Sequence, residues 1–167
     1  MMRVLPLLAA LCLATTLFAP APATPPAPPL LQRLVGHWTM KGKVGSTSVT
    51  YHLDAAWTLQ RAFIELHMVD AEHAPPGYEA RVFVGPDTLP DRLVTHWLDN
   101  TGAAFSIPAG TGEIHGDTLS LDFPYPAGAF HDSFVLDRKQ NAWTIRLDAA
   151  DGAGGWKRFA EYRATRR

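Results

Sequence analysis

The sequence predicts an all-β fold: an antiparallel up-and-down β-barrel of about ten strands, with a short helical turn before the first strand. Apolar and polar residues alternate along most of the chain after Val35, as in Tyr51, Leu53 and Ala55 with polar residues between them. This period of two places one face of each strand on a core and the other in water. Breaks rich in Gly, Pro, Asn and Asp separate the runs at the short intervals typical of sandwiches and barrels.

The predicted elements follow one another as hairpins. A single helical turn is expected over 30–34, because Leu30, Leu31, Leu34 and Val35 lie at i, i+1, i+4 and i+5. Strands are expected at residues 35–44, 47–58, 61–69, 78–84, 92–98, 103–107, 110–115, 118–123, 129–137 and 142–149, with an eleventh candidate near 155–164. Hairpins in series favour a meander, and closing it into a barrel removes the edge strands that invite aggregation. A barrel of this size has room for one ligand inside.

The N-terminal segment predicts export from the cytoplasm. Arg3 precedes an apolar run over 4–18, and alternate alanines over 19–23 offer cleavage sites of the Ala-x-Ala kind. We therefore expect residues 1–23 to be a cleavable signal peptide and the mature protein to be periplasmic or secreted. The apolar run is too short for a comfortable membrane span, so no stable span is expected after cleavage. An uncleaved N-terminal anchor is the alternative.

Composition and charge narrow the rest of the chain to one globular domain. The 167 residues carry 15 Lys and Arg against 16 Asp and Glu, a formal net charge of −1. This balance argues against a nucleic-acid partner, because such proteins normally show a basic excess. Residues 24–32 are rich in Pro and Ala and predict a disordered spacer, which leaves 33–167 for the barrel domain. The only cysteine, Cys12, lies in the predicted signal peptide, and no feature of the sequence indicates an oligomeric state.

A Gly-His-Trp motif, from Gly36 to Trp38, opens the first predicted strand shortly after the helical turn. This motif resembles the signature of the lipocalins and the wider calycin superfamily. The resemblance implies that Gly36 and Trp38 belong to the closure of one barrel end, where an Arg from near the C-terminus packs across the Trp ring. Arg158 and Arg163 are the candidates, and we expect Arg158 because alternation puts it on the same strand face as Tyr162.

Further short motifs follow in an order that is similar to an uncharacterised secreted bacterial family predicted to form lipocalin-like barrels. They are the segments 57–63 and 96–102, a hairpin over 112–117 and the terminal Glu161-Tyr162-Arg163. The resemblance covers residues 33–166. It implies a fold and no particular activity, because no activity is established for that family and one fold hosts many functions.

The sequence lacks the motifs that would indicate catalysis or a metal centre. It contains no G-x-S-x-G, H-E-x-x-H, C-x-x-C or P-loop pattern, and its seven histidines show no ligand spacing. Glu65 and His67 share one strand face. The apolar residues Ile64, Leu66 and Met68 lie on the other face and should pack in the interior, so the pair is expected to face water. We therefore predict no enzyme, no metal site and no cofactor.

Aromatic and apolar residues indicate a ligand site instead. Tyr51, Val82, Trp97 and Leu121 come from different strands and fall on predicted inward faces, so they should line one cavity if the barrel is hollow. His96 is a candidate polar anchor for the ligand, and its direction stays open because the run around it is apolar on both faces. The same aromatics would equally well fill a packed core.

These observations rank three functions. The first is an exported barrel that binds a small apolar or amphipathic molecule. The second is a packed barrel that acts as an interaction protein through its outer surface. An enzyme comes third, because the sequence supplies no convergent pair of titratable groups. A haem-binding barrel is a variant of the first function and would need His96 or His131 on an inward face.

Overall fold

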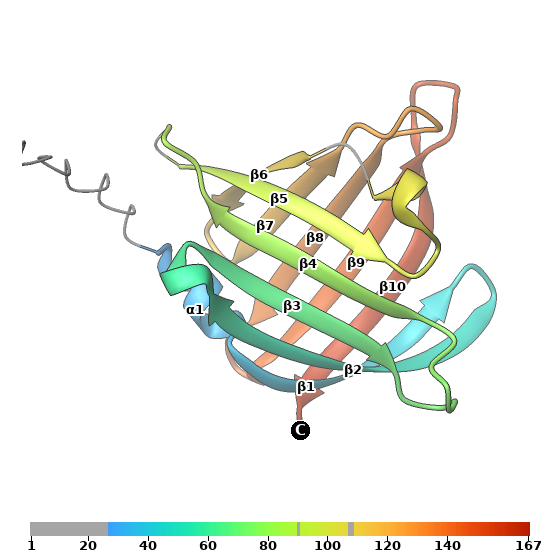
Figure 1. Cartoon of the computed structure of the whole chain (residues 1–167), viewed down its shortest axis with the longest axis horizontal. Coiled ribbons are helices and arrows are strands. Elements are labelled where there is room, and N and C mark those ends of the chain that lie inside the picture. Colours follow the sequence, from blue (N-terminus) through green and yellow to red (C-terminus); the bar gives the residue numbers. More distant parts are fainter. Residues whose placement is uncertain (1–26, 90, 107–108) are drawn as a thin grey trace, which may run out of the picture.

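Ten antiparallel strands form a closed barrel in the computed structural model, which describes residues 27–89, 91–106 and 109–167 (Figure 1). The strands are β1 (Gly36–Val44), β2 (Thr47–Thr58), β3 (Phe63–Asp70), β4 (Glu79–Pro86), β5 (Arg92–Asp99), β6 (Gly110–His115), β7 (Thr118–Phe123), β8 (Phe130–Asp137), β9 (Ala142–Ala150) and β10 (Trp156–Arg166). Each strand pairs with its neighbours along the chain, and β1 pairs with β10 to close the sheet. The predicted up-and-down barrel of about ten strands is confirmed.

Alternation along each strand decides which side chains fill the barrel. On β3, Ile64, Leu66 and Met68 are buried, whereas Glu65 and His67 lie on the outer face as predicted. The same alternation runs round the barrel, so one continuous apolar core fills its interior. Burying a large apolar side chain contributes about 1.5–3 kcal/mol, and this core is what holds together a domain without cysteine.

One predicted strand is wrong. Where the sequence suggests a strand over 103–107, the structure has a 3-10 turn, η2 (Ala103–Phe105), and β5 pairs directly with β6. Gly102, with a φ of 129°, turns the chain at the start of this segment. The ring of Phe105 is 65% exposed, so the short apolar run has no core to pack against and no reason to continue as a strand.

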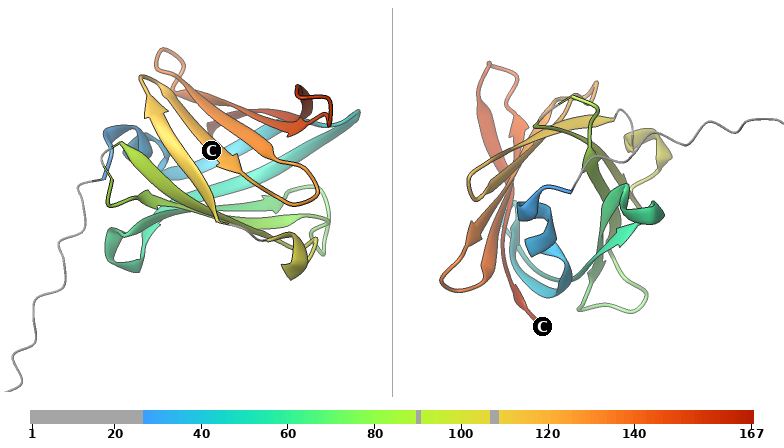
Figure 2. Two further views of the ribbon diagram at one scale, coloured as in Figure 1. Left: turned by 90° about the horizontal axis from the view of Figure 1, so that it is seen from above. Right: turned by 90° about the vertical axis from the view of Figure 1, so that its left-hand side faces the viewer.

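A short helix, α1 (Pro29–Leu34), lies across one end of the barrel (Figure 2). Its three leucines are all buried in the core, which confirms the predicted helical turn. The helix also shortens the predicted spacer, because residues 29–32 belong to it. Residues 1–26, with the predicted signal peptide and the start of the spacer, lie outside the described residues. Within the described part, no helix has the length and apolarity needed to cross a membrane.

Trp38 closes the barrel beneath α1. It is fully buried, and its indole N–H donates a hydrogen bond to the carbonyl of Leu34 at 2.7 Å. The guanidinium carbon of Arg166 lies 3.9 Å from the centroid of the Trp38 ring, and its Nη1 donates to the carbonyl of Val35 at 2.8 Å. Gly36 makes room for this arginine: its φ is 133°, and a β-carbon there would lie 1.6 Å from Nη1 of Arg166. Gly36 and Trp38 therefore both belong to the closure.

The arginine over the Trp ring is Arg166, and the expectation of Arg158 is wrong. Arg158 lies on the outer face of β10, where its Nε donates to Asp148 at 2.5 Å. The cause is a β-bulge at Phe159, where the register between β10 and β9 shifts. The extra residue inverts the alternation of inward and outward side chains. Arg158, which precedes the bulge, therefore faces outward, whereas strict alternation predicts that it faces inward. The other candidate, Arg163, bonds to side chains of the turn between β8 and β9.

Candidate ligand site at the aromatic end of the barrel

The end of the barrel opposite α1 is lined with aromatic side chains. In Figure 1, α1 lies at the left and the hairpin between β1 and β2 lies at the right, so the strands run between two different ends. We call the second one the aromatic end; its members are Tyr51, Tyr78, Trp97, Phe123, Tyr125, Phe130 and Tyr162. Four of them, Tyr78, Trp97, Tyr125 and Phe130, are only partly buried. This end therefore meets solvent, whereas the α1 end is sealed.

Ring contacts form two groups at the aromatic end, which the hydrogen bond between Trp97 and Tyr78 joins into a cluster. The ring centroid of Tyr51 lies 5.5 Å from that of Tyr78 and 5.7 Å from that of Tyr162. The ring centroid of Phe123 lies 6.0 Å from that of Trp97 and 5.8 Å from that of Tyr125. Separations of this size are typical of favourable aromatic pairs. The cluster thus forms a wall of ring faces and edges with defined positions.

Hydrogen bonds fix the polar atoms of two members. The indole N–H of Trp97 donates to the hydroxyl of Tyr78 at 3.2 Å, and that hydroxyl donates to Asp99 at 3.3 Å. Burial raises the pKa of Tyr78, and the negative charge of Asp99 raises it further. The Tyr78 hydroxyl therefore stays protonated, and the chain of donors ends on a carboxylate at the rim of the barrel.

Asp132 is a carboxyl group buried within the barrel wall. It lies on the inward face of β8, opposite Leu121 of β7 and Leu147 of β9, and is 2% exposed. Its Oδ1 has no hydrogen-bond partner. Burial raises the pKa of Asp132 well above its ordinary value, and the negative charges of Asp148 and Asp122 raise it further. The carboxyl is therefore neutral over a pH range in which an exposed aspartate is charged.

Asp132 lies within electrostatic reach of two tyrosines of the aromatic end. Burial is the main cause that raises the pKa of Tyr125 to about 12, and the charges of Asp132 and Asp99 add to it. The pKa of Tyr162 is raised by burial first, then by Tyr51 and Asp132. These hydroxyls therefore remain protonated donors at neutral pH. The aromatic end combines apolar rings, a few neutral hydroxyls and one inward carboxyl.

The four residues predicted to line a cavity all fall on inward faces, but at different depths. Tyr51 and Trp97 belong to the aromatic end. Val82 and Leu121 have no exposed surface, because the core fills the barrel around them. The accessible part of the predicted set is therefore restricted to its two aromatic members.

His96 faces outward, which decides the direction that the sequence left open and rules out the candidate inward polar anchor. Thr95 is buried and Trp97 packs against the core, so the residue between them points away from the interior, and its ring lies 6.4 Å from that of Phe63. His131 also faces outward, bonded to Asp122 at 2.7 Å. Neither histidine named for the haem alternative can reach an iron inside the barrel. The described residues also hold no group of three His, Cys, Asp or Glu placed to bind a metal ion.

Asp132 is the residue that sequence reasoning missed. A signal was present, because Asp132 is the one polar member of the inward set Phe130, Asp132, Phe134 and Leu136 on a predicted strand. An acidic residue in the apolar phase of an alternating strand is unusual, since isolated buried charge is costly. Its neighbourhood depends on β7, β9 and β10, which only the folded barrel brings together.

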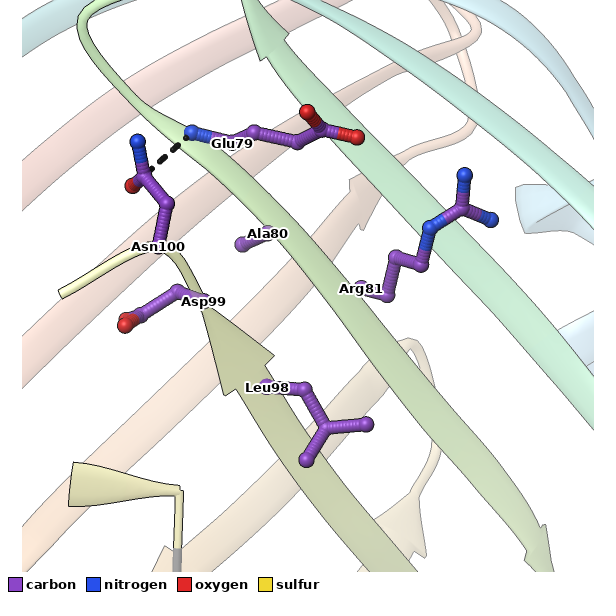
Figure 3. A pocket seen from close by; sticks show the side chains of 6 residues that line it. All are labelled: Glu79, Ala80, Arg81, Leu98, Asp99 and Asn100. Atoms are coloured by element: carbon purple, nitrogen blue, oxygen red, sulfur yellow. Dashed lines mark hydrogen bonds between the residues drawn. The ribbon is translucent and has the colours of Figure 1, made fainter. Parts of the chain in front are cut away.

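A shallow hollow of about 200 Å³ lies where the start of β4 meets the end of β5, lined by Glu79, Ala80, Arg81, Leu98, Asp99 and Asn100 (Figure 3). Its polar groups already have partners. Arg81 pairs with Glu65, Glu79 bonds to His67 at 2.7 Å, and Asn100 accepts a bond from the backbone of Glu79 at 3.2 Å. We therefore place the candidate site at the aromatic end, where Asp132 has an unpartnered atom.

Comparison with known proteins identifies the barrel and nothing finer. No protein-family model matches the chain, and no curated protein matches it. Among solved structures, the chain is similar to the crystal structure of Rv2717c from M. tuberculosis, with a TM-score of 0.53 and 16% sequence identity. The match covers 84% of this chain and 98% of that chain. At this identity the likeness shows a shared fold alone.

Proposed function

We propose that this protein is an exported, lipocalin-like barrel that binds a small apolar or amphipathic molecule at its aromatic end. One observation carries the proposal: the barrel is sealed at one end by α1, Trp38 and Arg166, while the other end presents partly exposed aromatic rings with an unpartnered carboxyl, Asp132, in the wall. Ligand sites are mostly apolar and concave, with a small number of polar groups that orient what they hold. The aromatic end has this composition.

The packing of the core limits how deep the ligand lies. Val82 and Leu121 are fully buried among other core side chains, so the middle of the barrel offers no ready space. The ligand is therefore held against the rings of the aromatic end and not along the barrel axis. This shallow position favours a small molecule, and aromatic side chains suit it because they offer large contact areas at little cost in side-chain entropy.

Export supports a carrier or sequestering role, because a protein outside the cytoplasm meets small apolar molecules from its surroundings. The proposal of a periplasmic or secreted location rests on the signal peptide expected over residues 1–23. N-terminal sequencing of the mature protein is expected to begin between Pro20 and Thr24. Soluble protein that retains Met1 would contradict export by cleavage.

Binding of octanol tests the proposed function, because octanol is a small neutral amphipathic molecule. We expect octanol to change the fluorescence of Trp97. The Trp97→Phe variant should lose this change, which distinguishes the signal of Trp97 from that of the other four tryptophans. Ala80 lies on the inward face of β4, two residues from Tyr78, and is 1% exposed. In Ala80→Phe, the new ring should occupy the site and weaken binding about tenfold or more, a loss of about 1.4 kcal/mol.

Ala56→Phe is the matched control. Ala56 lies on the outer face of β2 and is exposed, so the same substitution there should leave octanol binding unchanged. Circular dichroism of both variants verifies that the barrel forms. Equal binding by Ala80→Phe and Ala56→Phe, or no binding by the wild type, would move the packed interaction protein to first place.

A further inference from the structure

Three carboxyl groups lie at or next to the aromatic end, on the same sheet face as the exposed amino group of Lys157. Among the described residues, Asp132 is the only buried residue with a carboxyl, amino or guanidinium group. Asp99, at the end of β5, accepts the hydroxyl of Tyr78. Asp70, at the end of β3, pairs across the sheet with Tyr51; burial raises the pKa of that tyrosine, and the charge of Asp70 raises it further. The summed field of such groups concentrates cations at the opening of a low-dielectric site.

The unpartnered oxygen of Asp132 requires a partner when the carboxyl is charged. A buried carboxylate is costly unless it is paired with a cation or accepts several hydrogen bonds. Neither Leu121 nor Leu147, the residues opposite Asp132 on the two neighbouring strands, can supply one. The tyrosine and tryptophan rings of the aromatic end add π faces, which attract cations. An ammonium group satisfies both features at once.

We propose that the ligand of the aromatic end is an amphipathic amine, whose ammonium group pairs with the carboxylate of Asp132 while its apolar part packs on the aromatic rings. This inference rests on the proposed function and names its ligand class. A ligand with a carboxylate head would be repelled by Asp99 and Asp70 and would form no ion pair with Asp132. A neutral alcohol would gain the ring contacts without the ion pair, so it should bind more weakly than the amine.

Proton exchange follows from this pairing. Before binding, Asp132 holds a proton at pH values below its raised pKa, and the free amine is an ammonium ion in water. When they pair, the O–H bond of Asp132 breaks and its proton leaves to solvent, while the ammonium keeps all of its protons. About one proton is therefore released for each amine bound, and affinity rises about tenfold per pH unit while Asp132 is protonated in the free protein. An alcohol releases none.

The other ionisable groups around Asp132 are two tyrosines of the aromatic end and the paired side chains of the outer face. Tyr125 and Tyr162 have raised pKa values and stay protonated. Asp148, on the outer face, is paired with Arg158, and Asp122 is paired with His131. His131 is the neighbouring imidazole, and His131→Gln is the control that removes it.

Calorimetric titration with octylamine, octanol and octanoate tests the inference, because the three share one apolar chain. For the wild type near pH 7, we expect octylamine to bind at least about tenfold more tightly than octanol, and octanoate to bind most weakly. Titrations in two buffers of different ionisation enthalpy, at a pH below the raised pKa of Asp132, should report about one proton released by octylamine and none by octanol. Asp132→Asn should lose the preference for the amine and the proton release, and His131→Gln should behave as the wild type.

The outcomes separate the inference from the proposed function. Equal affinity for octylamine and octanol, tighter binding of octanoate, or amine binding without proton release would each overturn the amine inference while the barrel still binds octanol. The proton count is measured on the wild type alone, so it decides the question even if Asp132→Asn does not fold. Failure of all three molecules to bind would refute the proposed function itself.

Discussion

Replacing Trp38 by alanine should lower the free energy of unfolding by about 3–5 kcal/mol. The side chain is fully buried beneath α1, donates a hydrogen bond to the carbonyl of Leu34, and carries the guanidinium of Arg166 on its ring. The substitution removes this apolar volume and leaves a cavity at the sealed end of the barrel. Urea unfolding of the mature domain, followed by circular dichroism, measures the loss.

A double-mutant cycle tests the partnership of Trp38 with Arg166. Because the two side chains touch, Trp38→Ala and Arg166→Ala should show a coupling energy of at least about 0.5 kcal/mol. Arg158→Ala is the matched control, since Arg158 lies on the outer face and pairs with Asp148; its effect should be within about 1 kcal/mol and add to that of Trp38→Ala. Additive effects for Arg166 would show that it does not support the closure.

Removing the carboxyl of Asp132 should change how stability depends on pH. The folded protein holds this proton to a higher pH than the unfolded chain, because burial raises the pKa of Asp132. Between the unfolded pKa, about 4, and the folded pKa, the folded state binds more protons, so the free energy of unfolding falls by up to about 1.4 kcal/mol per pH unit. Asp132→Leu should abolish this loss. At pH 7 its free energy of unfolding should exceed that of the wild type by at least about 1–3 kcal/mol.

Urea unfolding of both proteins between about pH 4 and pH 8 measures the difference. Carboxylates such as Asp117 and Glu161, whose pKa values are lowered by arginine partners, act in the opposite direction, but their effect lies below about pH 4. Asp122→Asn is the control, since it removes a neighbouring carboxyl from the outer face. Parallel pH profiles for the wild type and Asp132→Leu would show that Asp132 is not held neutral in the folded state.

This second prediction also connects stability to function. A buried carboxyl without a partner is costly for the folded protein, and an apolar residue between Leu121 and Leu147 would pack better. Residues that break a local rule of folding are expected at functional sites. Asp132 is such a residue, and an amine ligand that neutralises it would recover part of the cost on binding.

Local pattern was sufficient to predict most of the strands and several of their faces. The outward position of Glu65 and His67 follows from alternation on β3 alone, because the period of two repeats without interruption there. The helical turn of α1 follows from the spacing of its leucines. The prediction of a strand over 103–107 was wrong because it rested on a short apolar run alone. A strand also needs a neighbour with free hydrogen-bonding groups, and β5 and β6 pair with each other instead.

Faces and contacts between distant segments were decided by the tertiary structure. The bulge at Phe159 inverts the alternation on β10 and turns Arg158 away from the interior, and no residue type in that run indicates it. The direction of His96 depends on which face of β5 packs inward. Because both faces of β5 carry apolar residues, only the packing against the core decides this. In both cases the deciding information lies in the neighbouring strands.

The sequence by itself determined the fold class and the order of the strands, because strand period and turn residues are properties of short segments, and the resemblance of its Gly-His-Trp motif implied the Gly36–Trp38 half of the closure. Only the tertiary structure decided which arginine covers Trp38, which end of the barrel is open, and that Asp132 lies inward near Tyr125 and Tyr162. The physical reason is that barrel closure joins β1 to β10 across the whole length of the chain. Contacts made by that closure, and the burial that raises the pKa of Asp132, exist only once every strand has found its neighbours.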